Sequence, residues 1–224
     1  MSGQTMQSRK ISQIQQPSIK TVRIVLLGQE GVGKSALVVR FLTRRFIGEY
    51  DSNLESSYRH ISDIDGVVFC LDIIDTAGEV TERKLQQCRS QGDIFLILYS
   101  IADRKSFQEA ANIGKYLQND RPLQKPKGLA LVGNKNDLEH FREVVKPEAR
   151  DLATELSCSF YEISVSERTG FEEVSDVIHS CLRQYLKHAQ YDRPERNASV
   201  SYLSKMKEGI KKRRNSIRRK SVAF

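Results

Sequence analysis

The chain has 224 residues, enough for one domain with flanking extensions, and 39% of them are hydrophobic. No apolar run approaches the roughly 18 residues that span a membrane, and the N-terminus lacks the apolar region of a secretory signal. The formal net charge is +8, but Lys187–Phe224 alone carries +9, so the remainder is nearly neutral. We therefore expect a disordered extension (1–19), a folded domain (20–190) and a basic tail (191–224).

The segment Gly28–Ser35 fits the pattern Gly-x-x-x-x-Gly-Lys-[Ser/Thr] of a phosphate-binding loop. An apolar run at 22–27 predicts a buried strand before it, and 35–42 predicts the helix that follows. Such a loop surrounds phosphates with backbone N–H groups, while the lysine reaches the β- and γ-phosphates and the serine hydroxyl ligates Mg²⁺. The predicted phosphate-contacting residues are Gly28, Gln29, Glu30, Gly31, Val32, Gly33, Lys34, Ser35 and Ala36.

Beyond this loop, strands alternate with helices. Residues 44–57 form a polar stretch that we expect to lack regular structure, and Asp65-Gly66 predicts a hairpin turn between strands at 58–64 and 67–74. Further strands are predicted at 94–100, 129–133 and 160–163, and further helices at 105–117, 147–156 and 171–186. This pattern predicts an α/β fold of the P-loop NTPase type. Its sheet has six strands and is mostly parallel, with one antiparallel edge hairpin and helices on both faces.

Three polar motifs follow predicted strands: Asp75-Thr76-Ala77-Gly78, Asn134-Lys135-Asn136-Asp137 and Ser164-Val165-Ser166. Because ligands bind at the carboxyl ends of parallel strands, we expect these motifs to meet the phosphate loop. A carboxylate ending an apolar strand is costly unless compensated, which favours Asp75 as a Mg²⁺ ligand. The N–H of Gly78 could contact a terminal phosphate. The carboxylate of Asp137 could accept hydrogen bonds from N1–H and the exocyclic amine of guanine, a donor pair that adenine lacks. The stem of Lys135 could cover the purine.

The ordered motifs resemble those of Ras-family small GTPases over about residues 20–187, and finer matches at 49–60 and 152–156 resemble a Ras-like branch without a lipidation box. This resemblance implies a monomeric GTPase that binds GTP or GDP with Mg²⁺ and hydrolyses GTP to GDP. It also implies that Phe46 stacks on guanine, that Ser164 and Val165 contact the guanine carbonyl, and that effectors and regulators bind at 48–58 and 76–91. The implied metal ligands are Ser35, Asn53 and Asp75, and the implied catalytic group is Lys34, Gly78 and Glu79.

The sequence departs from the family pattern at sensitive positions. Asn53 replaces the Mg²⁺-coordinating threonine of the first switch, and Glu79 replaces the glutamine that orients the attacking water. Glu30 replaces a glycine, and its side chain would lie near the γ-phosphate and the path of an arginine finger, which is worth about 10³ to 10⁵ in rate. Ser166 replaces a lysine, a milder change. We therefore predict normal guanine nucleotide binding with slow turnover.

The basic tail has its own pattern. Leu203, Met206, Ile210 and Ile217 share one helical face separated by Lys and Arg, and Ser221–Phe224 contains no Cys for prenylation. The pattern is typical of an amphipathic helix on an anionic membrane or of a calmodulin target. It is also compatible with nuclear import, nucleic-acid contact or a solvated charge run. Ser216 and Ser221 follow basic residues, as kinase substrates do, and phosphates there would weaken membrane binding.

Three functions from different classes remain open. The first is a GTP-hydrolysing signalling switch, and the second is a nucleotide-holding interaction protein with vestigial hydrolysis, favoured by Glu30, Asn53 and Glu79. The third is a regulator that acts at membrane or nucleic acid through its tail, with nucleic acid the less favoured partner. The cysteines at 70, 88, 158 and 181 lack metal-type spacing and predict reduced thiols in a cytoplasmic protein. The tail leaves peripheral membrane or nuclear placement open.

Overall fold

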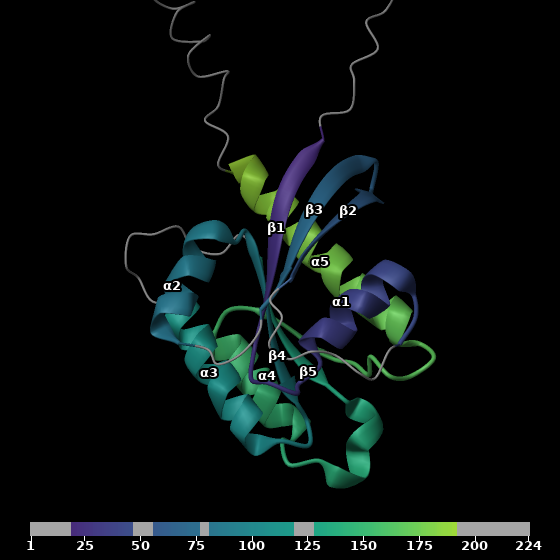
Figure 1. Cartoon of the computed structure of the whole chain (residues 1–224). Helices are drawn as coiled ribbons and strands as arrows, with labels where there is room; N and C mark the ends of the chain where they lie inside the picture. The colour runs from purple at the N-terminus through teal and green to yellow at the C-terminus, as the bar shows by residue number, and fades with distance from the viewer. Residues whose placement is uncertain (1–18, 47–55, 77–80, 119–127, 192–224) are drawn as a thin grey trace, which may run out of the picture.

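The structure is a computed structural model that describes residues 19–46, 56–76, 81–118 and 128–191. Strands and helices alternate through these ranges (Figure 1). The elements are β1 (Lys20–Leu27), α1 (Lys34–Thr43), β2 (Ser56–Ile64), β3 (Val67–Asp75), α2 (Glu82–Gln91), β4 (Ile94–Ser100), α3 (Arg104–Gln118), β5 (Gly128–Asn134), the 3-10 helix η1 (Asn136–Phe141), α4 (Lys146–Glu155), β6 (Ser159–Glu162) and α5 (Gly170–Tyr191). The expected N-terminal extension and basic tail, and the site candidates Asn53, Gly78 and Glu79, lie outside the described residues.

The described strands form one six-stranded sheet in the order β2-β3-β1-β4-β5-β6. The pair β2–β3 is antiparallel and the other neighbours are parallel. At the hairpin, Asp65 and Gly66 both have positive φ, at 53° and 78°, which suits the twist of a two-residue turn. The predicted fold is confirmed, including its single antiparallel edge.

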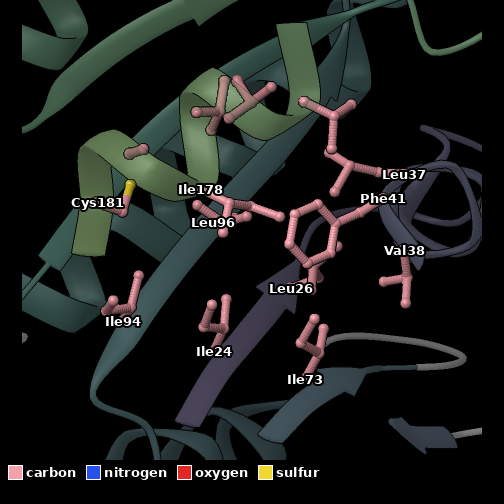
Figure 2. Close-up of a cluster of buried hydrophobic side chains, with 14 of the residues drawn as sticks. Ile24, Leu26, Leu37, Val38, Phe41, Ile73, Ile94, Leu96, Ile178 and Cys181 are labelled. Carbon is pink, nitrogen blue, oxygen red and sulfur yellow. The ribbon is translucent and has the colours of Figure 1, made fainter. Parts of the chain in front are cut away.

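Helices cover both faces of this sheet. Alternate residues of β1 point to opposite faces, so Ile24 and Leu26 pack under α1 and α5, whereas Val25 and Leu27 pack under α2, α3 and α4. Figure 2 shows Phe41 of α1 and Ile178 of α5 above the strands on the first face. Each such side chain contributes about 1.5–3 kcal/mol when fully buried. The sheet therefore holds the strand ends in a fixed relative position.

Three elements differ from expectation, and one of them is η1, a short 3-10 helix that the sequence did not predict. Helix α2 was not predicted, because within its charged sequence the residues buried are Leu85 and Cys88, too few for a clear apolar period. Strand β2 begins at Ser56, so the expectation that the irregular stretch continues through residue 57 was wrong. At the sheet edge, β2 alternates half-buried and exposed residues, and backbone pairing with β3 rather than an apolar pattern extends the strand.

The strand order also determines where a ligand can bind. From β1 the chain moves to β3 on one side and later to β4 on the other, so the connections diverge at β1. In open α/β sheets the ligand crevice lies outside the carboxyl ends of the strands at such a divergence. The segment at that point is Gly28–Lys34. No helix in the described ranges combines the length and the apolar character needed to cross a bilayer.

Candidate functional site

The loop between β1 and α1 is packed tightly against neighbouring strands. Gly28 has φ 141° and Gly33 has φ 99°, a region that side chains disfavour. A Cβ at Gly28 would collide with the carbonyl of Leu98 on β4, and one at Gly33 would collide with the amide nitrogen of Asn134 on β5. The two glycines therefore allow the loop to lie directly on the ends of both strands.

Lys34 begins α1, and its ammonium is held by the loop itself. Its Nζ donates to the backbone oxygens of Gly28 at 2.8 Å and Gln29 at 2.9 Å. Burial lowers the pKa of Lys34, while the negative charges of Asp75 and Glu30 act in the opposite direction. A cation at a helix N-terminus, with carboxylates near enough to influence its pKa, is a charge arrangement that suits phosphate and a divalent cation.

The metal-binding candidates described by the structure are a buried carboxylate and a hydroxyl. Asp75 ends β3 beside Leu26 of β1 and is 3% exposed. Ser35 lies in the first turn of α1, directly after Lys34. These are hard oxygen donors, and Mg²⁺ is usually bound by one or two such groups together with substrate phosphates and water. The donor set fits Mg²⁺.

Asn134 connects the phosphate loop to the loop that follows β6. Its side chain is 2% exposed; Nδ2 donates to the carbonyl of Val32 at 2.8 Å, and Oδ1 accepts from the N–H of Val165 at 3.2 Å. An amide side chain carries both a donor and an acceptor, so this one buried residue can hydrogen-bond a backbone carbonyl in one loop and a backbone N–H in the other. The segments that the sequence predicts to bind phosphate and base thus lie beside each other.

The other base-binding candidates are held beside Asn134. The hydroxyl of Ser164 donates to Oδ1 of Asp137, and the N–H of Ser164 donates to Oε2 of Glu173 on α5 at 2.9 Å. Lys135 adopts a left-handed conformation with φ 65°, which directs the chain from β5 into η1. The hydrogen bond from Ser164 fixes one oxygen of the Asp137 carboxylate, and this orients the group proposed to recognise the base.

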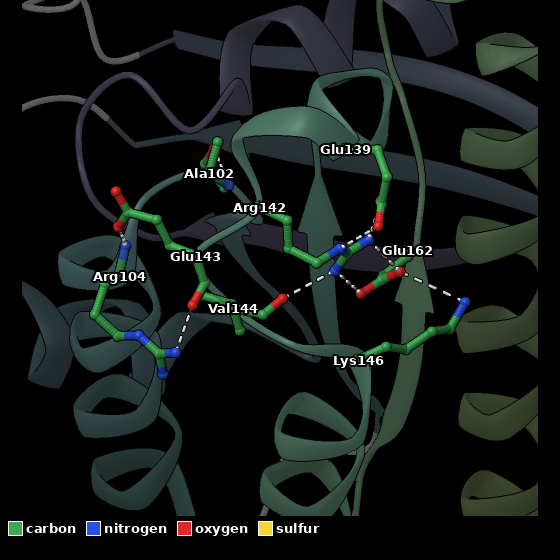
Figure 3. Close-up of polar contacts among 9 residues, drawn as sticks. Ala102, Arg104, Glu139, Arg142, Glu143, Val144, Lys146 and Glu162 are labelled. Carbon is green, nitrogen blue, oxygen red and sulfur yellow. Dashed lines mark hydrogen bonds and ion pairs between the residues drawn. The ribbon is translucent and has the colours of Figure 1, made fainter.

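An ion-pair network fixes the flank of these loops (Figure 3). Nη1 of Arg142, just after η1, lies 2.9 Å from Oε1 of Glu162, whose side chain is 5% exposed at the end of β6. Nζ of Lys146 lies 3.5 Å from the other oxygen of Glu162, and Nη2 of Arg142 lies 2.6 Å from Glu139. The network therefore connects the Asn134–Asp137 motif with the strand that leads to Ser164.

The structure also shows how the remaining candidates lie. Phe46 is 45% exposed at the end of a described range, so its predicted stacking on guanine is not tested. Ala36 lies on α1 and its side chain packs into the core between the helix and the sheet. The side chain of Gln29 donates to Asp103, which caps α3, at 3.5 Å.

Sequence reasoning missed several residues that support the site, namely Arg40, Asp103, Arg142, Glu162 and Glu173. Arg40 had a signal, since it is a charged residue on the apolar face of the predicted helix, three residues after Leu37. Of the remaining residues singled out, Cys70, Cys88, Cys158 and Cys181 are free thiols, as expected.

Comparison with known proteins agrees with this arrangement. Residues 23–186 match the Ras family. The chain belongs to the Ras family. The human Ras-related and estrogen-regulated growth inhibitor is 44% identical over 165 residues, 73% of this chain and 80% of that protein. The Ras-like protein rasS of Dictyostelium discoideum is 38% identical over 169 residues, 75% of this chain and 85% of that protein. The mouse GTP-binding protein Rit1 is 39% identical over 167 residues, 74% of each chain. The resemblance that the motifs predicted is confirmed, and this Ras-family protein is a Ras-like, GTP-binding small GTPase with a phosphate loop.

Proposed function

We propose that this Ras-family protein is a GDP/GTP signalling switch that binds guanine nucleotide with Mg²⁺ and hydrolyses GTP slowly. The observation that carries the proposal is the position of Asn134, whose side chain bonds to the carbonyl of Val32 and to the N–H of Val165. Through this residue the phosphate loop and the loop after β6 are held side by side, as the two sides of one nucleotide-binding site would be. A site between these two loops would suit a purine at one end and a polyphosphate at the other.

In the proposed complex, the backbone of residues 28–33 and the ammonium of Lys34 contact the phosphates. Ser35 and Asp75 hold Mg²⁺, which would neutralise developing charge between phosphate oxygens. The predicted third ligand, Asn53, lies outside the described residues. At the other end, Asp137 accepts hydrogen bonds from guanine, Ser164 and Val165 contact its carbonyl, and Lys135 and Phe46 cover its faces.

Slow turnover is the finer part of the proposal. Burial lowers the pKa of Lys34, and the negative charge of Glu30 is close enough to oppose this effect in part. A negative charge there repels the γ-phosphate and crowds the approach of an arginine finger, so GTPase-activating partners should have little effect. Glu79 lies outside the described residues, and a carboxylate at its position would add to the repulsion.

The test uses the full chain. Calorimetry on nucleotide-stripped protein should show binding of GDP and no binding of ADP at the same concentration, and Asp137→Asn should remove this preference. Single-turnover GTP hydrolysis should be faster in Glu30→Gly, Glu79→Gln and the double variant than in the unaltered chain. Equal affinity for GDP and ADP would overturn the nucleotide assignment. Unaltered hydrolysis as fast as the double variant would overturn only the slow-turnover proposal.

We also propose that effectors and regulators bind at 48–58 and 76–91, and that residues 198–224 contact an anionic membrane reversibly. Each basic residue near an anionic leaflet contributes about 1 kcal/mol. A fluorescent protein fused to 198–224 should accumulate at the cell periphery. Accumulation in the nucleus, or a diffuse signal, would reject membrane contact.

A further inference from the structure

Arg40 is a charged residue within the packed interface of α1. It is 8% exposed and lies on the same helix face as Leu37 and Phe41, which belong to the core. Burying a guanidinium is costly unless hydrogen-bond acceptors replace the lost water. The contacts of Arg40 therefore show what this position stabilises.

The guanidinium reaches across to the loop that follows β6. Its Nη2 donates to the carbonyl of Glu167 at 2.6 Å and to that of Arg168 at 3.0 Å. Both carbonyls belong to the turn between Val165 and Gly170, the first residue of α5. Hydrogen bonds from a charged donor are stronger than neutral ones, so this contact restrains the turn.

The same helix begins at the phosphate loop. Six residues separate Lys34 from Arg40, which is about 9 Å along a helix axis. One end of α1 thus carries the residues proposed to contact phosphate and Mg²⁺, and its middle holds the turn that follows the base-contacting residues. Asn134 joins the same two loops from the side of β5, so Arg40 supplies a second connection between them.

We propose that Arg40 is a positioning residue for guanine nucleotide retention. By holding the carbonyls of Glu167 and Arg168 against α1, it keeps the loop after β6 closed over the base and slows nucleotide release. The inference rests on the proposed function, because it assigns a role at the same proposed site. Arg40 touches neither the reacting phosphates nor the attacking water, so its effect is on retention and not on the chemical step.

Arg44 provides a matched control on the same interface. It lies one turn further along, at the C-terminal cap of α1, and its guanidinium carbon lies 4.8 Å from the ring centroid of Phe171 on α5. Arg40 joins α1 to the turn just before α5, whereas Arg44 contacts an aromatic ring on α5 itself and does not contact the turn. Loss of either weakens helix packing, whereas loss of Arg40 also releases the loop.

The experiment compares Arg40→Met, Arg40→Lys and Arg44→Met in the full chain loaded with a fluorescent GDP analogue. Dissociation is followed after addition of excess GDP, and single-turnover GTP hydrolysis is measured in parallel. Losing a charged hydrogen-bond donor should raise the dissociation rate of Arg40→Met about tenfold. Arg40→Lys keeps a charged donor and should lie between Arg40→Met and the unaltered chain. Arg44→Met should stay within about twofold on the same scale, and the hydrolysis rate of bound GTP should not change in any variant.

An unchanged dissociation rate in Arg40→Met would overturn the inference while leaving the proposed function intact. An equal increase in Arg44→Met would also overturn it, because general loosening of the α1–α5 interface would then be sufficient. Failure of the unaltered chain to retain the analogue would instead reject the proposed function. If Arg40→Met does not fold, Arg40→Lys decides the question by the same comparison with Arg44→Met.

Discussion

Two tyrosine-to-phenylalanine changes should alter stability in opposite directions. Tyr99 on β4 is fully buried, and its hydroxyl has no hydrogen-bond partner among the described residues. The hydroxyl lies over Gly133, the paired residue of β5, which has no side chain to bond to it. In contrast, the hydroxyl of Tyr161 on β6 donates to Oγ of Ser180 at 2.7 Å. Removing the first hydroxyl relieves a desolvation cost, whereas removing the second breaks a bond.

A buried unsatisfied hydroxyl costs about 1–3 kcal/mol, so Tyr99→Phe should raise the free energy of unfolding by about 1 kcal/mol or more. Tyr161→Phe should lower it by about 1 kcal/mol. For a domain of this size, each kcal/mol corresponds to about 2–4 °C in Tm. Thermal unfolding with saturating GDP and Mg²⁺ measures both shifts, provided that the GDP affinity of each variant is measured as well. Destabilisation by Tyr99→Phe as large as that by Tyr161→Phe would refute the reasoning.

The same residue predicts a pH dependence. Burial raises the pKa of Tyr99 above its usual value of 10.0, and the negative charge of Glu162 raises it further. A raised pKa means that the folded state holds this proton more tightly than the unfolded state. The free energy of unfolding is therefore unaffected by this ionisation below about pH 10, and it falls as pH rises beyond that value because the unfolded state loses the proton more easily. Above pH 10 the advantage of Tyr99→Phe over the unaltered chain should widen, as urea unfolding at pH 8 and pH 10.5 would show. A constant difference would contradict this.

Further changes test other parts of the structure. Arg142→Met removes one of the described ion-pair partners of Glu162 and leaves Lys146. Urea unfolding should show a free energy of unfolding lower by about 2–3 kcal/mol. A decrease of less than about 0.5 kcal/mol, as for a surface pair, would contradict this. Gly33→Ala places a Cβ against the Asn134 amide in a backbone conformation with positive φ. Calorimetry should show GDP affinity about tenfold to a hundredfold weaker, while the circular dichroism spectrum stays unchanged. Unaltered affinity would refute this. Burial raises the pKa of the Cys181 thiol to about 12. Iodoacetamide at pH 8 should therefore label Cys181 slowly in the folded protein and faster once urea is added, as measured by mass spectrometry. Equal labelling in both conditions would contradict this prediction.

Much of the fold follows from local sequence patterns. The central strands β4 and β5 are continuous buried runs, and the two residues Asp65-Gly66 predict the turn of the antiparallel hairpin at the sheet edge. Helix α2 escapes prediction because its charged sequence has few buried residues, and tertiary packing on α3 replaces the missing pattern. A sequence pattern predicts a helix or strand where buried apolar residues recur at the period of that element. The prediction fails where too few residues of the element are buried.

The candidate site divides in a similar way. Gly28–Ser35 and Asn134–Asp137 are recognisable because phosphate and base chemistry require certain residue types at fixed spacing. The residues that hold these motifs in place act over long distances, and Arg40 contacts a carbonyl 127 positions away. No local pattern shows which acceptor a buried arginine will meet. The partners could therefore be found only once the fold had brought them together.

The direction of α5 has a consequence for how the molecule can be attached to other structures. β1 begins and α5 ends at the same pole, opposite the carboxyl end of β1 where the phosphate loop follows (Figure 1). Attachment at the end of α5 would therefore leave the proposed nucleotide site facing away from the attachment point. Fusion of another domain at the start of β1 should likewise leave the proposed nucleotide site unobstructed.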